Sequence, residues 1–485
     1  MARAAEMPAE NTRYLDIVQR GCDAILENAV DRYGPQHTGM ILSVLDRKTG
    51  KPLNRTPEGS TGVRWSDRTG TGGSNASLQQ DLYRVLYNVS RLTGEEKYSD
   101  AADHALKDFM VITQSPNTGF LAWGEHLYWN CFEDRLGDEM DKGHRTHEPK
   151  RSWVTIEQCL ELAPDNVIAY AKGLWEHQIG DQSTGNFSRH AHYDKGKPRV
   201  NFDFEKEASF FIHDWSWAYA ETQDPAFDHM VQVMNKRYMN KLNARNLVEM
   251  DASGQVERAE VAVPLWMLSM ATECGDAATR MPESTAKALR KNAAGHDKGF
   301  LALGHAPADP EKGFFYFAHM DTGEPFPMQR KKTDGYSAAW GLGYGIHSTA
   351  MFAPLAYTRQ LQLGDTPEGD AYRKLVLEAA DLYIDSRPSD DIDVWAGEYG
   401  AAIFTELAAY RISDDSKYLE AAKEIGELAI KVLWDNGSNP LPRGSSKIQY
   451  YDVTSYPDTV MLALLALHEA VNGLGPNVPV SDIIR

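Results

Sequence analysis

Apolar residues recur every three or four positions along most of the 485-residue chain, which is the spacing of one buried helix face. In the stretch 12–33 this spacing is carried by Leu15, Val18, Cys22 and Ile25, so a helix is predicted there. The same spacing predicts further helices over 77–92, 101–112, 154–162, 166–177, 259–272, 282–293 and 458–471.

Several of these helices form pairs joined by a short polar turn. The turn Thr-Gly-Glu-Glu-Lys-Tyr at 93–98 separates two helical stretches, and its Tyr opens the second one. Similar turns occur at 219–227 and 410–418, with a looser version at 357–372. Similar helix pairs along a whole chain favour one repetitive α-helical architecture, either an open solenoid or a closed ring.

The connections between the pairs are much longer than the turns inside them. They cover 34–75, 115–152, 180–203, 295–345, 388–396 and 435–455. Alternating short and long connections place all the long loops at one end of the helix stack, and long loops in compact domains are usually functional. We therefore predict an all-α fold, an (α/α)6 toroid over residues 1–485 as a single catalytic domain, with the site formed by the long loops at one end.

The charge and composition narrow the classes of partner. With 50 Lys and Arg against 69 Asp and Glu, the net charge of -19 repels nucleic acid and anionic lipid, so neither is expected as a partner. The four cysteines are scattered, so no disulfide framework is expected. We expect no leader, because the first residues contain no apolar run, and no membrane span, because no apolar stretch reaches the roughly 20 residues that cross a bilayer. We expect a soluble protein, either cytoplasmic or the mature form of an exported one.

Aromatic residues reach 10 % of the chain, and they concentrate in the long loops with His, Arg and carboxylates. The densest cluster is 120–149. Trp faces bind the apolar face of a sugar ring, and Asp, His and Arg satisfy its hydroxyls or an acidic substituent. A carbohydrate site is therefore predicted in this loop.

Three further clusters lie at 210–219, 334–347 and 395–400. Asp214 lies on a buried helix face, where a low dielectric raises the pKa of a carboxyl group toward that of a general acid. Glu398 opens another helix. The glycines near 341–345 lack the strand and lysine of a phosphate loop, so we interpret them as pocket wall.

Metal chemistry has less support in the sequence. His190, His192 and Asp194 alternate and could meet one cation, but no HExxH motif or Cys pair accompanies them. We expect no catalytic metal and no cofactor.

The hairpin pattern, together with Trp123-Gly-Glu-His-Leu-Tyr-Trp129 and His147-Glu-Pro-Lys150, resembles the (α/α)6-toroid carbohydrate enzymes that act on uronic acids. Among them the chain most resembles glycoside hydrolase family 154. This resemblance implies β-glucuronidase activity, the removal of a terminal glucuronic acid. Unsaturated glucuronyl hydrolases and toroid polysaccharide lyases share the fold, so the fold alone does not choose the chemistry.

A hydrolase of this kind needs one protonated and one ionised carboxyl group. The candidates are Glu125, Glu148, Asp214 and Glu398. Glu125 is the predicted acid, because Trp123 and Trp129 would desolvate it, and Asp214 is the predicted base. The predicted substrate-binding residues are Trp123, His126, Trp129, Arg145, His147, His213, Trp215, Tyr336, Trp340, His347, Trp395 and Tyr399. Of these, Arg145, His126, His147 and Tyr399 are the candidates for holding a uronate carboxylate.

Three alternatives remain open from the residues. A uronate polysaccharide lyase would use a Tyr or His base, with Arg or His neutralising the uronate. A sugar 2-epimerase would use paired His, and a non-catalytic glycan-binding protein would need only the aromatic platform. In each case the expected partner is a uronic-acid-containing oligosaccharide or polysaccharide, or a related glycan, and the broad outer faces of a toroid are compatible with a homodimer.

Overall fold

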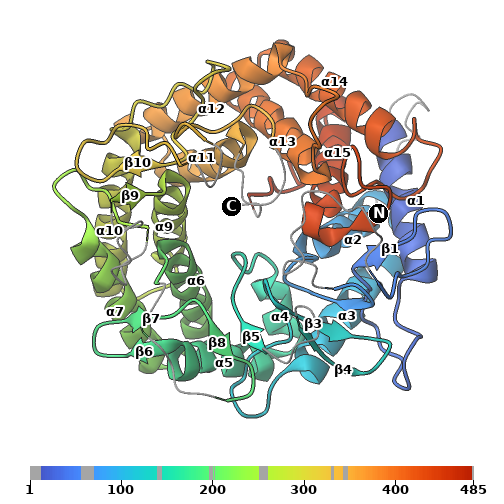
Figure 1. The fold of residues 1–485 in the computed structure, drawn as a ribbon, viewed down its shortest axis with the longest axis horizontal. Coiled ribbons are helices and arrows are strands. Elements are labelled where there is room, and N and C mark those ends of the chain that lie inside the picture. The colour runs from blue at the N-terminus through green and yellow to red at the C-terminus, as the bar shows by residue number, and fades with distance from the viewer. Residues whose placement is uncertain are drawn as a thin grey trace.

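The computed structural model of the chain is a ring of helices in two concentric layers (Figure 1). It describes residues 12–55, 70–138, 145–195, 200, 203–250, 260–328, 333–341 and 348–482. The inner layer consists of α2 (Gln80–Thr93), α4 (Ile156–Leu162), α6 (Glu205–Thr222), α9 (Pro264–Ala277), α11 (Thr349–Leu363), α13 (Ala396–Ser413) and α15 (Pro457–Asn472). The outer layer consists of α1 (Arg13–Asn28), α3 (Lys97–Thr113), α5 (Pro164–Gly173), α7 (Pro225–Lys241), α10 (Glu283–Leu301), α12 (Pro367–Asp385) and α14 (Ser416–Leu433).

The predicted all-α toroid of helical hairpins is confirmed. Six hairpins follow one another within the described residues, namely α2–α3, α4–α5, α6–α7, α9–α10, α11–α12 and α13–α14. The ring is then closed by α15, which packs against both α1 and α2. The hairpin pattern in the sequence does not predict that α15 pairs with α1, because these two helices come from opposite ends of the sequence.

Several predicted helix ends differ from the structure; for example, the helix predicted over 259–272 is α9, Pro264–Ala277. The helix predicted over 12–33 ends at Asn28. The helix predicted over 282–293 continues to Leu301, through Gly295 and Gly299. A Cβ at Gly299 would lie 2.0 Å from the carbonyl oxygen of Asn246, so this glycine permits close packing and does not end the helix.

The long loops contain short antiparallel strand pairs that helix periodicity does not predict. These are β1 (Val44–Leu45) with β11 (Tyr451–Asp452), β6 (Ile179–Asp181) with β7 (Asn186–Phe187), β9 (Val261–Ala262) with β10 (Ala318–His319), and β5 (Thr146–His147) with β8 (Ala191–His192). A three-stranded sheet joins β2 (Gly73–Ser74), β3 (Leu127–Asn130) and β4 (Arg135–Asp138). A π-helical turn (Leu174–Gln178) and a 3-10 turn (Val453–Ser455) complete the regular elements. The strands tie the loops into one layer at the end of the ring where the inner helices begin, which we call the mouth.

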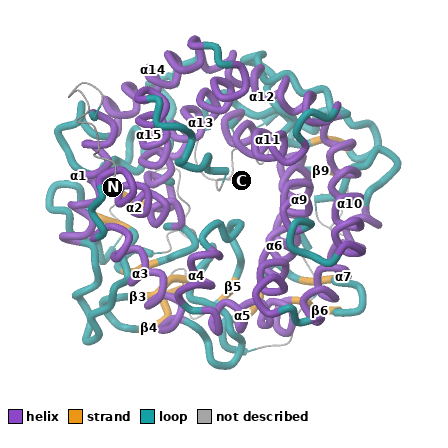
Figure 2. The backbone as a smooth tube through the Cα atoms, turned by 180° about the vertical axis from the view of Figure 1, so that it is seen from behind, coloured by secondary structure: helices purple, strands orange, loops and turns teal. Residues whose placement is uncertain are grey.

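The segment after α15 runs inside the ring (Figures 1 and 2). Val478 is fully buried, and its backbone N–H donates to Oε2 of Glu469 at 2.7 Å. Farther along, the Ser481 hydroxyl donates to Oδ2 of Asp81 in the first turn of α2, also at 2.7 Å. This segment therefore extends inside the ring from the end of α15 to the first turn of α2.

In the described part of the chain, no helix combines the length and apolar composition that a membrane crossing requires.

A buried ion pair fastens three helices of the ring. Arg359 on α11 and Asp297 on α10 are 4 % and 1 % exposed, and the guanidinium binds both carboxylate oxygens, at 3.0 and 2.6 Å. Tyr372 on α12 donates its hydroxyl to Oδ1 of Asp297 at 2.9 Å. Because both charges are buried, each depends on the other for compensation.

We predict that Arg359→Met lowers the free energy of unfolding by about 3–5 kcal/mol, because it leaves the Asp297 carboxylate buried without its counter-charge. Adding Asp297→Asn should recover part of that loss, since the uncompensated charge is then removed. Urea unfolding of the wild type and both variants measures this. A double variant less stable than Arg359→Met would contradict the electrostatic explanation.

Candidate functional site

Three loop segments that are distant in sequence meet at the mouth. Strand β5 pairs with β8, which brings 146–148 beside 190–192. Gly124 forms a parallel bridge with Glu148, and the N–H of Glu125 donates to the carbonyl of Glu148 at 3.1 Å. Gly124 has φ +97°, and a Cβ there would lie 2.0 Å from the same carbonyl oxygen, so only glycine allows this approach.

The Glu148 carboxylate is the centre of this assembly, and it is 1 % exposed. Its Oε2 lies 2.9 Å from Nε2 of His126 and 2.7 Å from Nε2 of His190, and its Oε1 lies 3.1 Å from Nη1 of Arg189. Burial acts to raise the pKa of Glu148, but Arg189 and the two imidazoles outweigh it and hold the pKa well below its ordinary value. A lowered pKa favours the ionised form of Glu148, so of the two roles considered for the candidate carboxyl groups it suits the ionised one.

The same three side chains fit a divalent cation. Nε2 of His126, Nε2 of His190 and a carboxylate oxygen of Glu148 all lie within 4.8 Å of one another. The His126 and His190 side chains are 13 % and 35 % exposed, so an ion can reach them from solvent. Two imidazoles and one carboxylate are a donor set suited to first-row divalent metals. From the sequence we expected no catalytic metal. These three side chains form a candidate metal site, so that expectation is revised.

The sequence pattern His190, His192, Asp194 identified only one member of this group. His192 faces elsewhere, since its Nδ1 accepts backbone N–H groups of Asp194 and Lys195 at 3.2 and 3.3 Å. Arg145, a predicted uronate ligand, forms an ion pair with Asp194. His190 and His192 are only two residues apart, yet the structure places them in different environments, which their spacing in the sequence does not predict.

Further charged groups surround the Glu148 cluster. Nζ of Lys150 lies 3.4 Å from Oε2 of Glu125, so a positive charge lies beside the carboxyl group predicted to be the acid. Glu207, in the first turn of α6, is fully buried, and burial raises its pKa, with Glu148 adding to the shift. Sequence reasoning missed both Glu207 and Arg189, because neither belongs to a motif of fixed spacing.

A second ionisable group lies in α6 itself. Asp214 is 4 % exposed, and its Oδ1 lies 3.0 Å from Nδ1 of His213. Burial raises the pKa of Asp214 despite the hydrogen bond from His213, which confirms the low-dielectric setting predicted for it. Burial lowers the pKa of His213, but the nearby carboxylates, Glu273 foremost, outweigh burial, and the net shift is upward.

Glu398 lies on α13, in the first turn of the helix. Burial raises its pKa to about 7, although hydrogen bonds from Ser348 and the backbone of Gly341 oppose the shift. Gly341 makes room for the carboxyl group, because a Cβ there would lie 2.6 Å from Oε1 of Glu398. Of the predicted binding residues near it, His347 lies outside the described residues.

Most of the aromatic residues that were predicted to bind a sugar are instead buried in the hydrophobic core. Trp123, Trp215, Trp340, Trp395 and Tyr399 are 0–5 % exposed, which leaves no ring face for a sugar. Trp123, for example, packs edge-on against the rings of Trp153 and Tyr170, and its Nε1 donates to the Tyr170 hydroxyl at 3.2 Å. Among the aromatic predictions that fall on described residues, only Trp129 and Tyr336 remain half-buried.

His147, which was predicted to hold a uronate carboxylate, is also buried in the core, and that prediction is corrected as well. It is fully buried, stacks on Phe120 at 4.1 Å and bonds to Gln178 and Tyr170. Burial lowers the pKa of His147 to about 3, so it is neutral at physiological pH and cannot neutralise a uronate.

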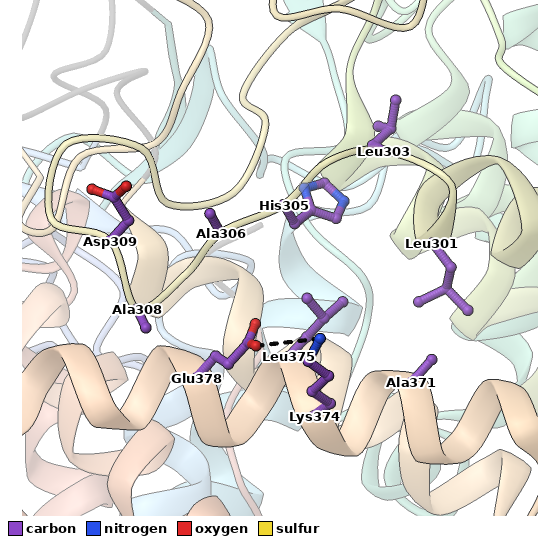
Figure 3. Close-up of a pocket in the computed structure, with 10 residues that line it drawn as sticks. All are labelled: Leu301, Leu303, His305, Ala306, Ala308, Asp309, Ala371, Lys374, Leu375 and Glu378. Carbon is purple, nitrogen blue, oxygen red and sulfur yellow. Dashed lines mark ion pairs between the residues drawn. The ribbon is translucent and has the colours of Figure 1, made fainter.

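A pocket of about 400 Å³ lies on the outer wall of the ring (Figure 3). It is lined by the segment after α10, including Leu303, His305 and Asp309, and by Leu375 with the Lys374–Glu378 ion pair of α12. None of the site residues predicted from sequence lines it.

We predict a pH-dependent stability difference for Glu398→Gln. A carboxyl group whose pKa is raised on folding contributes stability below its unfolded pKa of about 4.5, and that contribution is lost as pH rises through 7. The stability of Glu398→Gln relative to wild type should therefore increase by about 2–3 kcal/mol between pH 5 and pH 8.

Thermal and urea unfolding at both pH values measure this difference, with Glu311→Gln on an exposed loop as the matched control. An equal effect of the two substitutions at pH 5 and pH 8 would contradict a raised pKa at Glu398.

Comparison with known proteins gives one family match. Residues 56–215 match the sequence model of a family described as periplasmic pectate lyase. These residues include Glu125, His126, Glu148, Arg189 and His190. A curated relative, a pectate disaccharide-lyase from Dickeya dadantii (strain 3937), is 28 % identical over 121 residues, covering 25 % of this chain and 22 % of that lyase.

Solved structures give a broader set of similar rings. A cellobiose 2-epimerase from Bacillus thermoamylovorans is 8 % identical with a TM-score of 0.47, covering 95 % of this chain and 100 % of its own. An unsaturated glucuronyl hydrolase specific for heparin is 11 % identical with a TM-score of 0.43, covering 95 % and 98 %. A family 76 α-mannanase from Bacteroides thetaiotaomicron is 8 % identical with a TM-score of 0.49, covering 97 % and 100 %. At these values the similarities assign no chemistry to this chain.

Proposed function

We propose that the chain is a carbohydrate-active enzyme that cleaves uronic-acid oligosaccharides or polysaccharides of the pectate type by β-elimination. The observation that carries this proposal is the Glu148 carboxylate, buried at the mouth between Arg189 and the imidazoles of His126 and His190. All four residues fall within the 56–215 segment that matches the pectate lyase family, which supports the same reaction class.

In β-elimination a base takes the proton on the carbon next to the uronate carboxylate, the electron pair of that C–H bond forms a carbon–carbon double bond, and the bond to the leaving sugar oxygen breaks. The leaving oxygen takes up a proton to become a hydroxyl group, so no water is consumed overall. The reaction is slow because negative charge develops on a group that is already anionic, so the main requirement is preorganised positive charge beside that carboxylate.

The residues around Glu148 meet this requirement. Arg189 can hold a carboxylate through two parallel N–H donors, and Lys150 and Lys206 lie in the same region, at 3.4 Å from Glu125 and 3.6 Å from Glu207. His126, Glu148 and His190 would hold a divalent cation, which when bound acts as a Lewis acid toward the uronate. In a protein of net charge -19, a cation bound there, together with Arg189, Lys150 and Lys206, would supply the local positive charge that an anionic sugar needs.

The β-glucuronidase implied by the resemblance to glycoside hydrolase family 154 is the second candidate. Glu398 favours it, because a buried carboxyl group with a pKa of about 7 is partly protonated at neutral pH and could serve as a general acid. Asp214 would then remain the candidate for the second carboxyl group. A hydrolase adds water and releases saturated glucuronic acid, whereas a lyase leaves an unsaturated uronate.

One experiment separates these candidates. The protein is incubated with a divalent cation and either polygalacturonate oligosaccharides or p-nitrophenyl β-glucuronide. The proposal expects ultraviolet absorbance from an unsaturated uronate with the oligosaccharides. Release of p-nitrophenol without any unsaturated product would overturn it in favour of the hydrolase, and a reducing sugar altered without chain cleavage would favour the epimerase.

We predict that His190→Ala lowers kcat/KM on oligogalacturonate by about 100-fold or more, because it removes one of the groups that organise the charge around Glu148. His192→Ala is the matched control, since His192 lies two residues from His190 but outside the cluster, and this variant should retain most of the activity. Equal losses in the two variants would show that the effect is structural.

A further inference from the structure

A groove of about 700 Å³ runs along α7, an outer helix, beside the turn that joins β6 to β7 (Figure 1). We call it the α7 groove. Its lining repeats at helical spacing, from His229 through Val233 and Lys236 to Lys241, and the turn at 183–184 forms its other wall. Because a helix rises about 1.5 Å per residue, this stretch is about 18 Å long. An open groove of this length suits an extended ligand.

The lining of the α7 groove is cationic, although the protein as a whole is acidic. Lys236, Arg237 and Lys241 bring three positive charges, and His229 adds a fourth when it is protonated. None of the nine described residues that line the groove is Asp or Glu. The whole chain, in contrast, has 69 acidic residues against 50 basic ones. A lining of this kind favours an anionic ligand against the overall field of the protein.

The three cations differ in how far they are already paired. Arg237 is fixed, because its Nε donates to Oδ2 of Asp203 at 2.8 Å and its Nη2 binds the same oxygen. Nζ of Lys241 lies 3.7 Å from Oε1 of Glu249. Lys236 is exposed, and in the described part of the chain its ammonium group forms no ion pair. The uncompensated positive charge of the α7 groove is therefore that of Lys236.

Polar groups beside Lys236 suit the hydroxyls of a sugar. Asn240 lies one turn farther along α7 and is exposed, and its amide makes no hydrogen bond with a described residue. Arg237 keeps its Nη1 for a ligand, because Asp203 takes only Nε and Nη2. An amide both donates and accepts hydrogen bonds, as a sugar hydroxyl does. One carboxylate flanked by hydroxyls, which is what a uronate unit offers, matches this set of groups.

The α7 groove lies close to the mouth. Arg237 binds Asp203, which lies two residues before α6 begins, so the C-terminal half of α7 is at the mouth end of the ring. From Thr184 the chain reaches His190 of the mouth cluster in six residues, which span at most about 20 Å. Both sites are therefore within reach of one polysaccharide of several units.

We propose that the α7 groove is a secondary binding site for uronate polysaccharide, outside the mouth. Lys236 binds a uronate carboxylate, and Asn240 and Arg237 bind neighbouring hydroxyls. Binding there raises the effective concentration of the same polymer at the mouth, as linked binding sites do. The choice of a uronate polymer rests on the function proposed above, whereas the anionic character of the ligand rests on the lining of the groove.

The test is the retardation of the full chain in native gels that contain polygalacturonate or its methyl-esterified form. The wild type should be retarded more strongly by the charged polymer. Lys236→Glu should raise the dissociation constant obtained from this retardation by about 3-fold or more, because it reverses the unpaired charge. Asn240→Asp adds a negative charge one turn away and should act in the same direction. Lys107→Glu, at an exposed lysine of α3 without an ion pair to a described residue, is the matched control and should behave as the wild type.

Equal dissociation constants for Lys236→Glu and the wild type would overturn the proposal, and so would a wild type that polygalacturonate does not retard. Equally strong retardation by polyglutamate would also overturn it, since the groove would then bind polyanions in general. Formation of unsaturated uronate from oligogalacturonate is read separately, so failure of the α7 groove and failure of the reaction proposed for the mouth are distinguishable.

Discussion

The arrangement of the mouth depends on one constraint, the burial of the Glu148 carboxylate. A buried charge must be compensated, and here the compensation comes from His126, Arg189 and His190, on segments that are more than twenty residues from Glu148 in sequence. Because these residues meet at Glu148, the segments 124–126 and 189–192 lie against the segment that contains Glu148. The β5–β8 pair and the Gly124 bridge join the same segments. The Glu148 carboxylate therefore holds the loops together, and the groups around it form the candidate site for a uronate and for a divalent cation.

The ring provides the rigid frame for this loop layer. Inner helices present their first turns to the mouth, so Glu207 on α6 and Glu398 on α13 reach it from different directions. The C-terminal segment runs inside the ring as far as Asp81 in the first turn of α2. Aromatic residues serve mainly to pack the frame, as the buried Trp215 and Trp123 show, while charged residues carry the proposed chemistry.

Periodicity and loop lengths were sufficient to predict the all-α ring and to place the site in the long loops. They could not predict the closing pair α15 and α1, which is non-local, or the π-turn and short strands, which tertiary contacts impose. For the site, composition identified Glu148, His126 and His190 separately. The pairing of β5 with β8 brings these residues together, and the register of that pairing cannot be predicted from their spacing in the sequence. The prediction that Trp123 and similar residues bind a sugar was wrong, because a cluster of aromatic residues in a loop is equally typical of core packing.

The central claim is that uronates bind at the cationic groups around Glu148. A crystal structure with Mn²⁺ and a bound oligogalacturonate, with anomalous scattering to locate the metal, tests this most directly. The account predicts an anomalous peak among His126, Glu148 and His190 and a sugar carboxylate within reach of Arg189. A sugar bound instead against Glu398 or in the outer-wall pocket, with no metal at Glu148, would contradict it.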